Sequence, residues 1–97
     1  MIRVNVYYQN NLPVGLKIKG HAEFGPYGQD LICASVSSII TGGFNAFREE
    51  DIVSCTLEEG NAEIYIYQNN ESVVILKTII TQLETIKSAY PENISIK

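Results

Sequence analysis

The residues best suited to chemistry in this chain are its only histidine, His21, and one of its two cysteines, Cys33, which flank a glycine-bearing loop. A cysteine is a useful nucleophile only as thiolate, and both a helix N-terminus and a neighbouring imidazole favour that form. If the loop folds back, the imidazole can reach the sulfur. The pair is therefore a candidate dyad for attack on a carbonyl. The alternative is that Cys33 is a small core residue and His21 an ordinary loop residue.

A helix is predicted to position the thiol. Asp30 is a favourable N-cap residue, and apolar residues at near-helical spacing follow it, so we expect a helix from about Leu31 to Arg48. Cys33 would then lie in the first turn, where unpaired amide groups could donate hydrogen bonds to an oxyanion. Gly42 and Gly43 weaken this helical prediction, and they could permit close packing or a bend.

Alternation of apolar and polar residues predicts a β-hairpin before this helix. Residues 2–8 and 14–19 each place their apolar side chains on one face, and residues 10–13 carry the turn signal between them. The second strand leads directly to His21. We therefore expect the histidine at the edge of a sheet.

A second hairpin and a second helix are predicted after the first helix. Residues 52–58 and 62–68 flank a compact turn, Ser72 can cap a helix that Pro91 ends, and residues 94–97 could add a short edge strand. The helix carries an apolar stripe that is expected to face the core. This stripe consists of Val73, Leu76, Ile79, Ile80, Leu83 and Ile86.

The element order predicts an α+β fold, with a mostly antiparallel sheet of about five strands and two packed helices in the order ββαββαβ. A chain of 97 residues that is 45% hydrophobic fits one domain over residues 1–97. It has no apolar run long enough to cross a bilayer, and its beginning alternates like a strand, so we expect a soluble, cytoplasmic protein without a membrane partner.

Charge and ligand content exclude several function classes. The formal net charge of -4 disfavours direct nucleic-acid binding, which usually needs a basic surface. One histidine and two separated cysteines do not supply a recognisable zinc ligand set, and the sequence predicts neither a metal site nor a cofactor.

The second cysteine and an acidic run are predicted to be structural or solvated. Both cysteines are expected to stay thiols in a reducing cytosol. Cys55 alternates with Val53 and Leu57, so it is expected to point into the core. The carboxylates of residues 49–51 are predicted to form a solvated connection between the first helix and the next strand.

Two motifs resemble the ribosomal-processing cysteine protease family, called Prp. They are Gly-His-Ala at residues 20–22 and, after the loop, Asp-Leu-Ile-Cys-Ala-Ser-Val-Ser at residues 30–37. The family pattern is Gly-His-Ala, a variable loop, then Asp, two apolar residues, Cys-Ala, two further residues and Ser. Ser35 departs from it, because the family often has alanine there, but both residues are small. The resemblance covers essentially the whole chain.

The resemblance implies that Cys33 is the nucleophile and His21 the general base, with Asp30 and Ser37 supporting the site. Asp30 could also contact His21, and Ser37 lies one turn beyond the sulfur, although its hydroxyl could simply bond a preceding carbonyl. The loop is expected to order over a bound peptide, with Phe24 and Tyr27 as apolar contacts or as packing against the body, and with Gln29 as a possible oxyanion donor. This possible substrate loop consists of Ala22, Glu23, Phe24, Gly25, Pro26, Tyr27, Gly28 and Gln29.

The resemblance further implies a function. It predicts a homodimeric endopeptidase that removes the amino-terminal extension of large-subunit ribosomal protein twenty-seven, so that the partner is the ribosomal protein precursor. The alternative from the residues is a non-catalytic acidic module that binds a basic ribosomal or assembly protein. RNA binding is a poorer third option, because the chain lacks a basic surface and a recognisable aromatic stacking motif.

Overall fold

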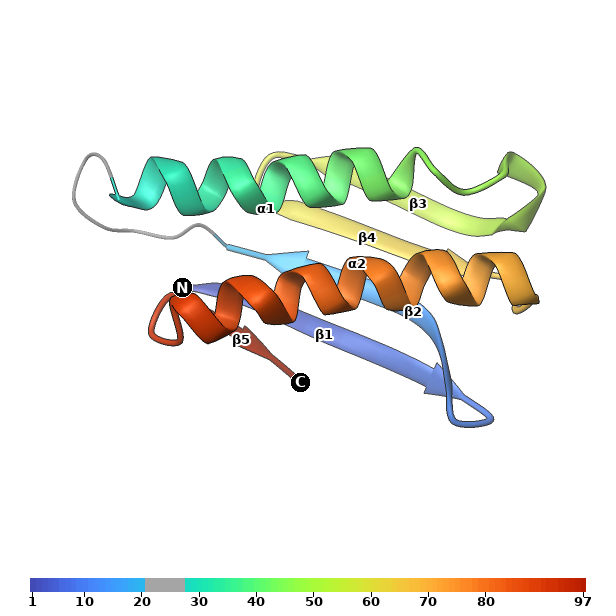
Figure 1. Ribbon diagram of the computed structural model, residues 1–97. Helices are drawn as coiled ribbons and strands as arrows, with labels where there is room; N and C mark the ends of the chain where they lie inside the picture. Colours follow the sequence, from blue (N-terminus) through green and yellow to red (C-terminus); the bar gives the residue numbers. More distant parts are fainter. Residues whose placement is uncertain (21–27) are drawn as a thin grey trace.

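The structure is a computed structural model that describes residues 1–20 and 28–97, with only the helical backbone described for residues 28–30. These residues form a five-stranded mixed sheet with two long helices packed on one face (Figure 1). In chain order the elements are β1 (Ile2–Gln9), β2 (Leu12–Lys19), α1 (Gly28–Phe44), the short 3-10 helix η1 (Glu49–Asp51), β3 (Ile52–Glu58), β4 (Asn61–Ile66), α2 (Asn70–Ala89) and β5 (Ile94–Ile96).

The order of strands across the sheet is β3-β4-β2-β1-β5. Neighbouring strands pair antiparallel, except for β5, which runs parallel to β1. The predicted α+β class, the order ββαββαβ and the short edge strand at the end of the chain are therefore confirmed. None of the helices in the described part of the chain is long and apolar enough to cross a membrane.

The first hairpin turns at Asn10 and Asn11, whose backbone φ angles are 54° and 63°. Asparagine tolerates this left-handed region better than most residues, and two such residues in a row suit a tight hairpin turn. Pro13 lies outside the turn, as the second residue of β2, where it pairs with Tyr8. The pairing register shifts between Tyr7 and Tyr8. Tyr8, at this irregularity, is 62% exposed.

Helix α1 begins earlier and ends earlier than predicted. It starts at Gly28, so Asp30 lies inside the first turn and is not the N-cap residue, and Cys33 lies in the second turn. It ends at Phe44, where the Ala46 amide donates to the Gly43 carbonyl in a tightened final turn. The chain then turns toward η1 and β3.

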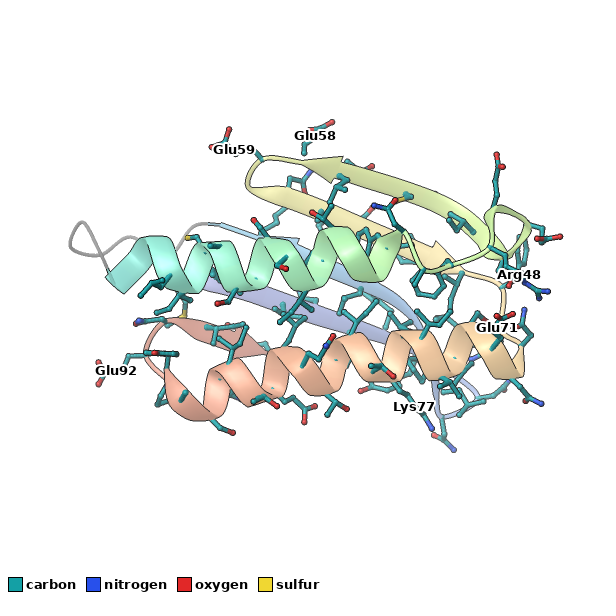
Figure 2. The ribbon with its side chains drawn as sticks, turned by 45° about the horizontal axis from the view of Figure 1, so that its top comes forward. Arg48, Glu58, Glu59, Glu71, Lys77 and Glu92 are labelled. Carbon is teal, nitrogen blue, oxygen red and sulfur yellow. The ribbon has the colours of Figure 1, made fainter. Side chains whose placement is uncertain are left out.

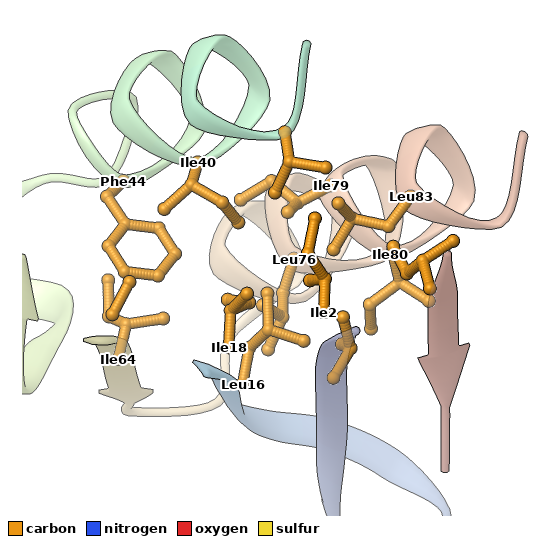
Figure 3. Close-up of a cluster of buried hydrophobic side chains, with 14 of the residues drawn as sticks. Ile2, Leu16, Ile18, Ile40, Phe44, Ile64, Leu76, Ile79, Ile80 and Leu83 are labelled. Atoms are coloured by element: carbon orange, nitrogen blue, oxygen red, sulfur yellow. The ribbon is translucent and has the colours of Figure 1, made fainter. Parts of the chain in front are cut away.

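The hydrophobic core fills the space between the sheet and the two helices (Figure 3). The predicted α2 stripe is confirmed, because five of its six residues are at most 9% exposed and Ile86 packs against the cluster at partial burial. Phe44 of α1 lies over Ile64 of β4 in the same cluster (Figure 3). The core therefore fixes α1, the helix that carries Cys33, against the strands.

Gly43 lets α1 approach α2 closely. A Cβ atom at Gly43 would lie 2.6 Å from both Cδ1 and Cγ1 of Ile79, which is 2% exposed. A Cβ atom at Gly42 would meet nothing within 4 Å. Of the two roles predicted for this glycine pair, close packing is the one that the structure confirms at Gly43.

These neighbouring glycines should respond to alanine with opposite signs. Gly43→Ala is expected to lower the free energy of unfolding by about 1 kcal/mol or more, because overpacking a filled core costs about 1 to 3 kcal/mol. Gly42→Ala should raise it by up to about 1 kcal/mol, because alanine loses less backbone entropy in a helix. Urea titrations of both variants test this. Equal destabilisation by the two would show that the helix end, and not the contact with Ile79, is the sensitive feature.

The acidic run after α1 is only partly solvated. Glu49 and Glu50 are exposed as predicted, but Asp51 is 6% exposed. Its carboxylate accepts hydrogen bonds from Arg48 Nε at 3.1 Å and from Asn69 Nδ2 at 2.9 Å. The prediction of a solvated connection is therefore wrong for Asp51, because these donors compensate the burial of its charge.

Asn69, not Ser72, is the N-cap residue of α2. The Asn69 side chain accepts from the Ser72 amide at 2.8 Å, and Ser72 Oγ accepts from the Asn69 amide at 3.1 Å. This reciprocal pair is a capping box, in which Ser72 occupies the third helical position. Arg48 Nε also lies 3.1 Å from Glu71 Oε2 in the first turn of α2 (Figure 2). This ion pair therefore links the segment before η1 to the start of α2.

Cys55 faces the predicted side of its strand but is exposed. It pairs with Ile64, and Leu57 pairs with Ala62, so both lie on the helix-facing side of the sheet. Cys55 is nevertheless exposed and Leu57 is 46% exposed, because β3 is the outermost strand of the sheet. The prediction that Cys55 is a core residue is therefore wrong.

Candidate active site

A cleft of about 410 Å³ opens between α1 and the tip of the β3–β4 hairpin. Cys33, Ser37 and Thr41 line it from α1, and each follows the previous one by four residues, so the three form one row along the helix. The hairpin tip, from Leu57 to Ala62, forms the opposite wall. Buried apolar residues of β1, β2 and α1 also line the cleft. These residues are Ile2, Ile18, Val36 and Ile40.

Cys33 is held by the core and also lines the cleft. Its side chain is half-buried and packs against the hydrophobic cluster, while Ser37, in the next turn, is exposed. The macrodipole of a helix acts mainly within its first turn. Because Cys33 lies in the second turn, and not in the first as predicted, the dipole of α1 acts on it more weakly than expected.

The residue immediately before His21 lies in the same cleft. Gly20 lines it together with Cys33, and its amide donates to the Gly60 carbonyl in the hairpin tip at 3.1 Å. The φ angle of Gly20 is 94°, and a Cβ atom there would come within 2.5 Å of the Met1 carbonyl oxygen. Gly20 therefore fixes the end of β2 between the chain start and the hairpin tip.

Some of the predicted site residues lie outside the described residues. His21 and the loop residues 22–27 are among them, and for Gly28, Gln29 and Asp30 only the helical backbone is described. Gly28 and Gln29, predicted to belong to the loop, are the first two residues of α1. Of the predicted set, the structure brings Cys33 and Ser37 together on one wall of the cleft.

Sequence reasoning did not single out Thr41 or the hairpin tip. Thr41 could have been found from its helical spacing to Cys33, but the hairpin tip depends on strand order, which no local pattern encodes. Glu58 and Glu59 at this tip extend away from α1 (Figure 2). They place negative charge on the outer wall of the cleft, and among the described residues no other Asp, Glu, Lys or Arg side chain lines it. Among the described residues, no group of three or more His, Cys, Asp or Glu side chains could hold a metal ion.

The two cysteines are expected to react with alkylating agents at different rates. Partial desolvation raises the pKa of the Cys55 thiol, so little of it is thiolate near neutral pH despite its exposure. Iodoacetamide should therefore modify Cys33 at least about tenfold faster than Cys55 if Cys33 is activated as a nucleophile. Peptide mapping after short exposure measures both rates. Each rise of one pH unit should speed Cys55 modification by about tenfold while the pH stays below the pKa of that thiol. Equal modification rates of Cys33 and Cys55 at neutral pH would contradict an activated Cys33.

The chain is similar to known proteins over nearly its full length. The family model described as "Cysteine protease Prp" matches residues 1–95. A ribosomal processing cysteine protease Prp of Mycoplasma genitalium is 34% identical over 99 residues, which cover 99% of this chain and 94% of that protein. The Prp of Staphylococcus aureus is 31% identical over 83 residues, which cover 79% and 78%.

A solved structure shares the fold. It is that of an essential ribosomal processing protease Prp from S. aureus in complex with a covalently linked product peptide, and it superimposes with a TM-score of 0.87 at 30% identity. The superposition covers 100% of this chain and 98% of the other.

Proposed function

The chain belongs to the cysteine protease Prp family and is a cysteine-type peptidase, and from this premise we propose that it removes the amino-terminal extension of large-subunit ribosomal protein twenty-seven. The observation that carries the proposal is that Cys33 and the residue preceding His21 line one cleft. The S. aureus relative was solved with a covalently linked product peptide, which supports a nucleophilic route for the present chain as well.

In the proposed reaction His21 accepts the proton of the Cys33 thiol, and the sulfur then attacks the carbonyl carbon of the scissile bond. The tetrahedral intermediate collapses, the amine leaves with the proton from His21, and a thioester remains on Cys33. Water, deprotonated by His21, hydrolyses that thioester and restores the thiol. Ser37 steadies the surroundings of the sulfur from the next turn, and Asp30 supports His21.

Features of the cleft support a peptide substrate. Its buried lining is apolar, which suits an apolar side chain next to the scissile bond. We propose that Phe24 and Tyr27 of the loop add contacts to that segment and that Gln29 donates to the oxyanion. The net charge of -4, with Glu58 and Glu59 on the outer wall, favours encounter with a basic ribosomal protein precursor.

The proposal is tested by incubating the purified protein with the full-length precursor from the same organism and weighing the products. We expect two products whose masses sum to that of the precursor plus one water, with the smaller one coming from the amino terminus. A stable complex without cleavage after long incubation would refute the peptidase assignment and would support an acidic binding module.

We also propose, from the family resemblance, that residues 1–97 form a single catalytic domain that acts in the cytoplasm as a homodimer. Light scattering of the purified protein tests the dimer, with a mass of two chains as the expected result. A monomer at the concentration used for cleavage would contradict it.

A further inference from the structure

The cleft extends well beyond the sulfur, along α1. Thr41 lies eight residues after Cys33 in the same row, and it is the member of that row farthest from the thiol. At 1.5 Å per residue the two Cα atoms are separated by about 12 Å along the helix axis. An extended peptide rises about 3.3 Å per residue, so it covers that distance in three to four residues.

Among the described residues, the hydroxyl of Thr41, like that of Ser37 in the same row, is not used in an intrahelical bond of the kind that several other helix hydroxyls make. Ser35 on α1 donates to the Leu31 carbonyl, and Thr78 and Thr85 on α2 donate to carbonyls four residues earlier, at 2.8 to 3.0 Å. In the part of the chain that the structure describes, Thr41 makes no such bond, and its residue is exposed toward the cleft. Its hydroxyl is therefore available as donor and acceptor to an occupant of the cleft.

We infer that Thr41 is a substrate-positioning residue, whose hydroxyl hydrogen-bonds the backbone of the bound peptide three to four residues from the carbonyl that Cys33 attacks. The inference rests on the proposed peptidase function and adds to it the length of peptide that the site reads. It requires an extended substrate, because a helical or turned peptide would not span the distance between the two residues.

The two sides of the cleft indicate why Thr41 would bind the backbone of the substrate peptide and not one of its side chains. The hairpin tip runs from Leu57 to Ala62 there, and the apolar lining lies beneath. A peptide lying in the cleft can bury an apolar side chain against that lining near Cys33, and its backbone then continues along the polar row. Because Thr41 is neutral, it binds without regard to the charge of the neighbouring substrate side chain.

The test compares Thr41→Val with wild type on a peptide that spans the precursor junction by six residues on each side. We expect KM to rise about 3- to 10-fold with kcat unchanged, the range for one lost hydrogen bond. Thr41→Ser, which keeps the hydroxyl, should restore KM. Thr81→Val on α2 is the matched control, because Thr81 is exposed and does not line the cleft; it should leave KM unchanged.

Shortened peptides test the predicted reach. One further peptide keeps only two residues before the scissile bond, and another keeps only two residues after it. The KM difference between wild type and Thr41→Val should disappear for the peptide that is too short to reach Thr41. An unchanged KM on the long peptide, or an increase that persists for both short peptides, would overturn the inference and leave the peptidase function intact. If the wild-type protein cleaved none of these peptides, the proposed function would be refuted, and the inference with it.

Discussion

Cys33→Ala is expected to lower kcat/KM for a junction peptide by at least about 1000-fold, because alanine cannot form the thioester on which the proposed reaction depends. The core should tolerate the change, since the side chain is half-buried and loses only its sulfur. Cleavage is followed by mass spectrometry, and the fold by circular dichroism. Cys55→Ala is the matched control, because it removes the other thiol from the exposed edge strand β3 and should leave cleavage unchanged.

His21→Ala should lower kcat/KM by about 100- to 10000-fold, the range for loss of a general base. The residue follows Gly20, whose position in the Cys33 cleft motivates the prediction. Undiminished turnover by either the Cys33 or the His21 variant would contradict its assigned role. If Cys55→Ala abolished cleavage while Cys33→Ala did not, the nucleophile would have to be sought on β3.

The fold was largely predictable from the sequence because its elements carry local patterns. The α2 stripe from Val73 to Leu83 is a helical repeat of large apolar residues, and the structure buries it as the pattern predicts. Helix boundaries were less predictable, because several residues could cap. Ser72 has the right side chain for an N-cap, yet Asn69 takes that position in a box that uses Ser72 as well. In this capping box both Asn69 and Ser72 are of the cap type, so residue type alone does not show which of them is the N-cap.

Burial at the sheet edge was not predictable from periodicity. Cys55 and Leu57 alternate correctly and lie on the helix-facing side, but alternation gives the face of a strand and not its place in the sheet. The opposite error occurred at Asp51, where a run of three carboxylates suggested solvent. Its burial depends on Arg48 and Asn69, and Asn69 is eighteen residues away in the sequence.

The candidate site was predictable to the extent that it is local. Cys33 and Ser37 share a helical face, and their spacing alone places them together. The opposite wall could not be found this way, because it is formed by the β3–β4 hairpin, which reaches the cleft through the pairing of β4 with β2. The same pairing brings the Gly60 carbonyl to the Gly20 amide. Strand order therefore determines both the shape of the cleft and the position of the chain just before His21.

Gly20→Ala tests this positional role most directly. Three features of the backbone meet at Gly20: a φ angle of 94°, a hydrogen bond from its amide to the Gly60 carbonyl, and the close approach of the Met1 carbonyl oxygen. Alanine is strained at this φ, and its Cβ atom would lie 2.5 Å from a backbone oxygen that cannot rotate away as a side chain could. The backbone at the end of β2 must therefore move.

We expect Gly20→Ala to lower the free energy of unfolding by about 1 to 3 kcal/mol and to reduce kcat/KM by about 100-fold, because a displacement of about 1 Å in a catalytic group can have that effect. The two effects are separated by assaying well below the unfolding temperature, beside Gly43→Ala, which should lose stability through its contact with Ile79 and yet keep its activity, since it does not line the cleft. If Gly20→Ala kept full activity, the link between the end of β2 and the reacting groups would have to be abandoned. A loss of activity confined to Gly20→Ala would instead show that catalysis depends on this backbone position, because Gly43→Ala would have lost stability alone.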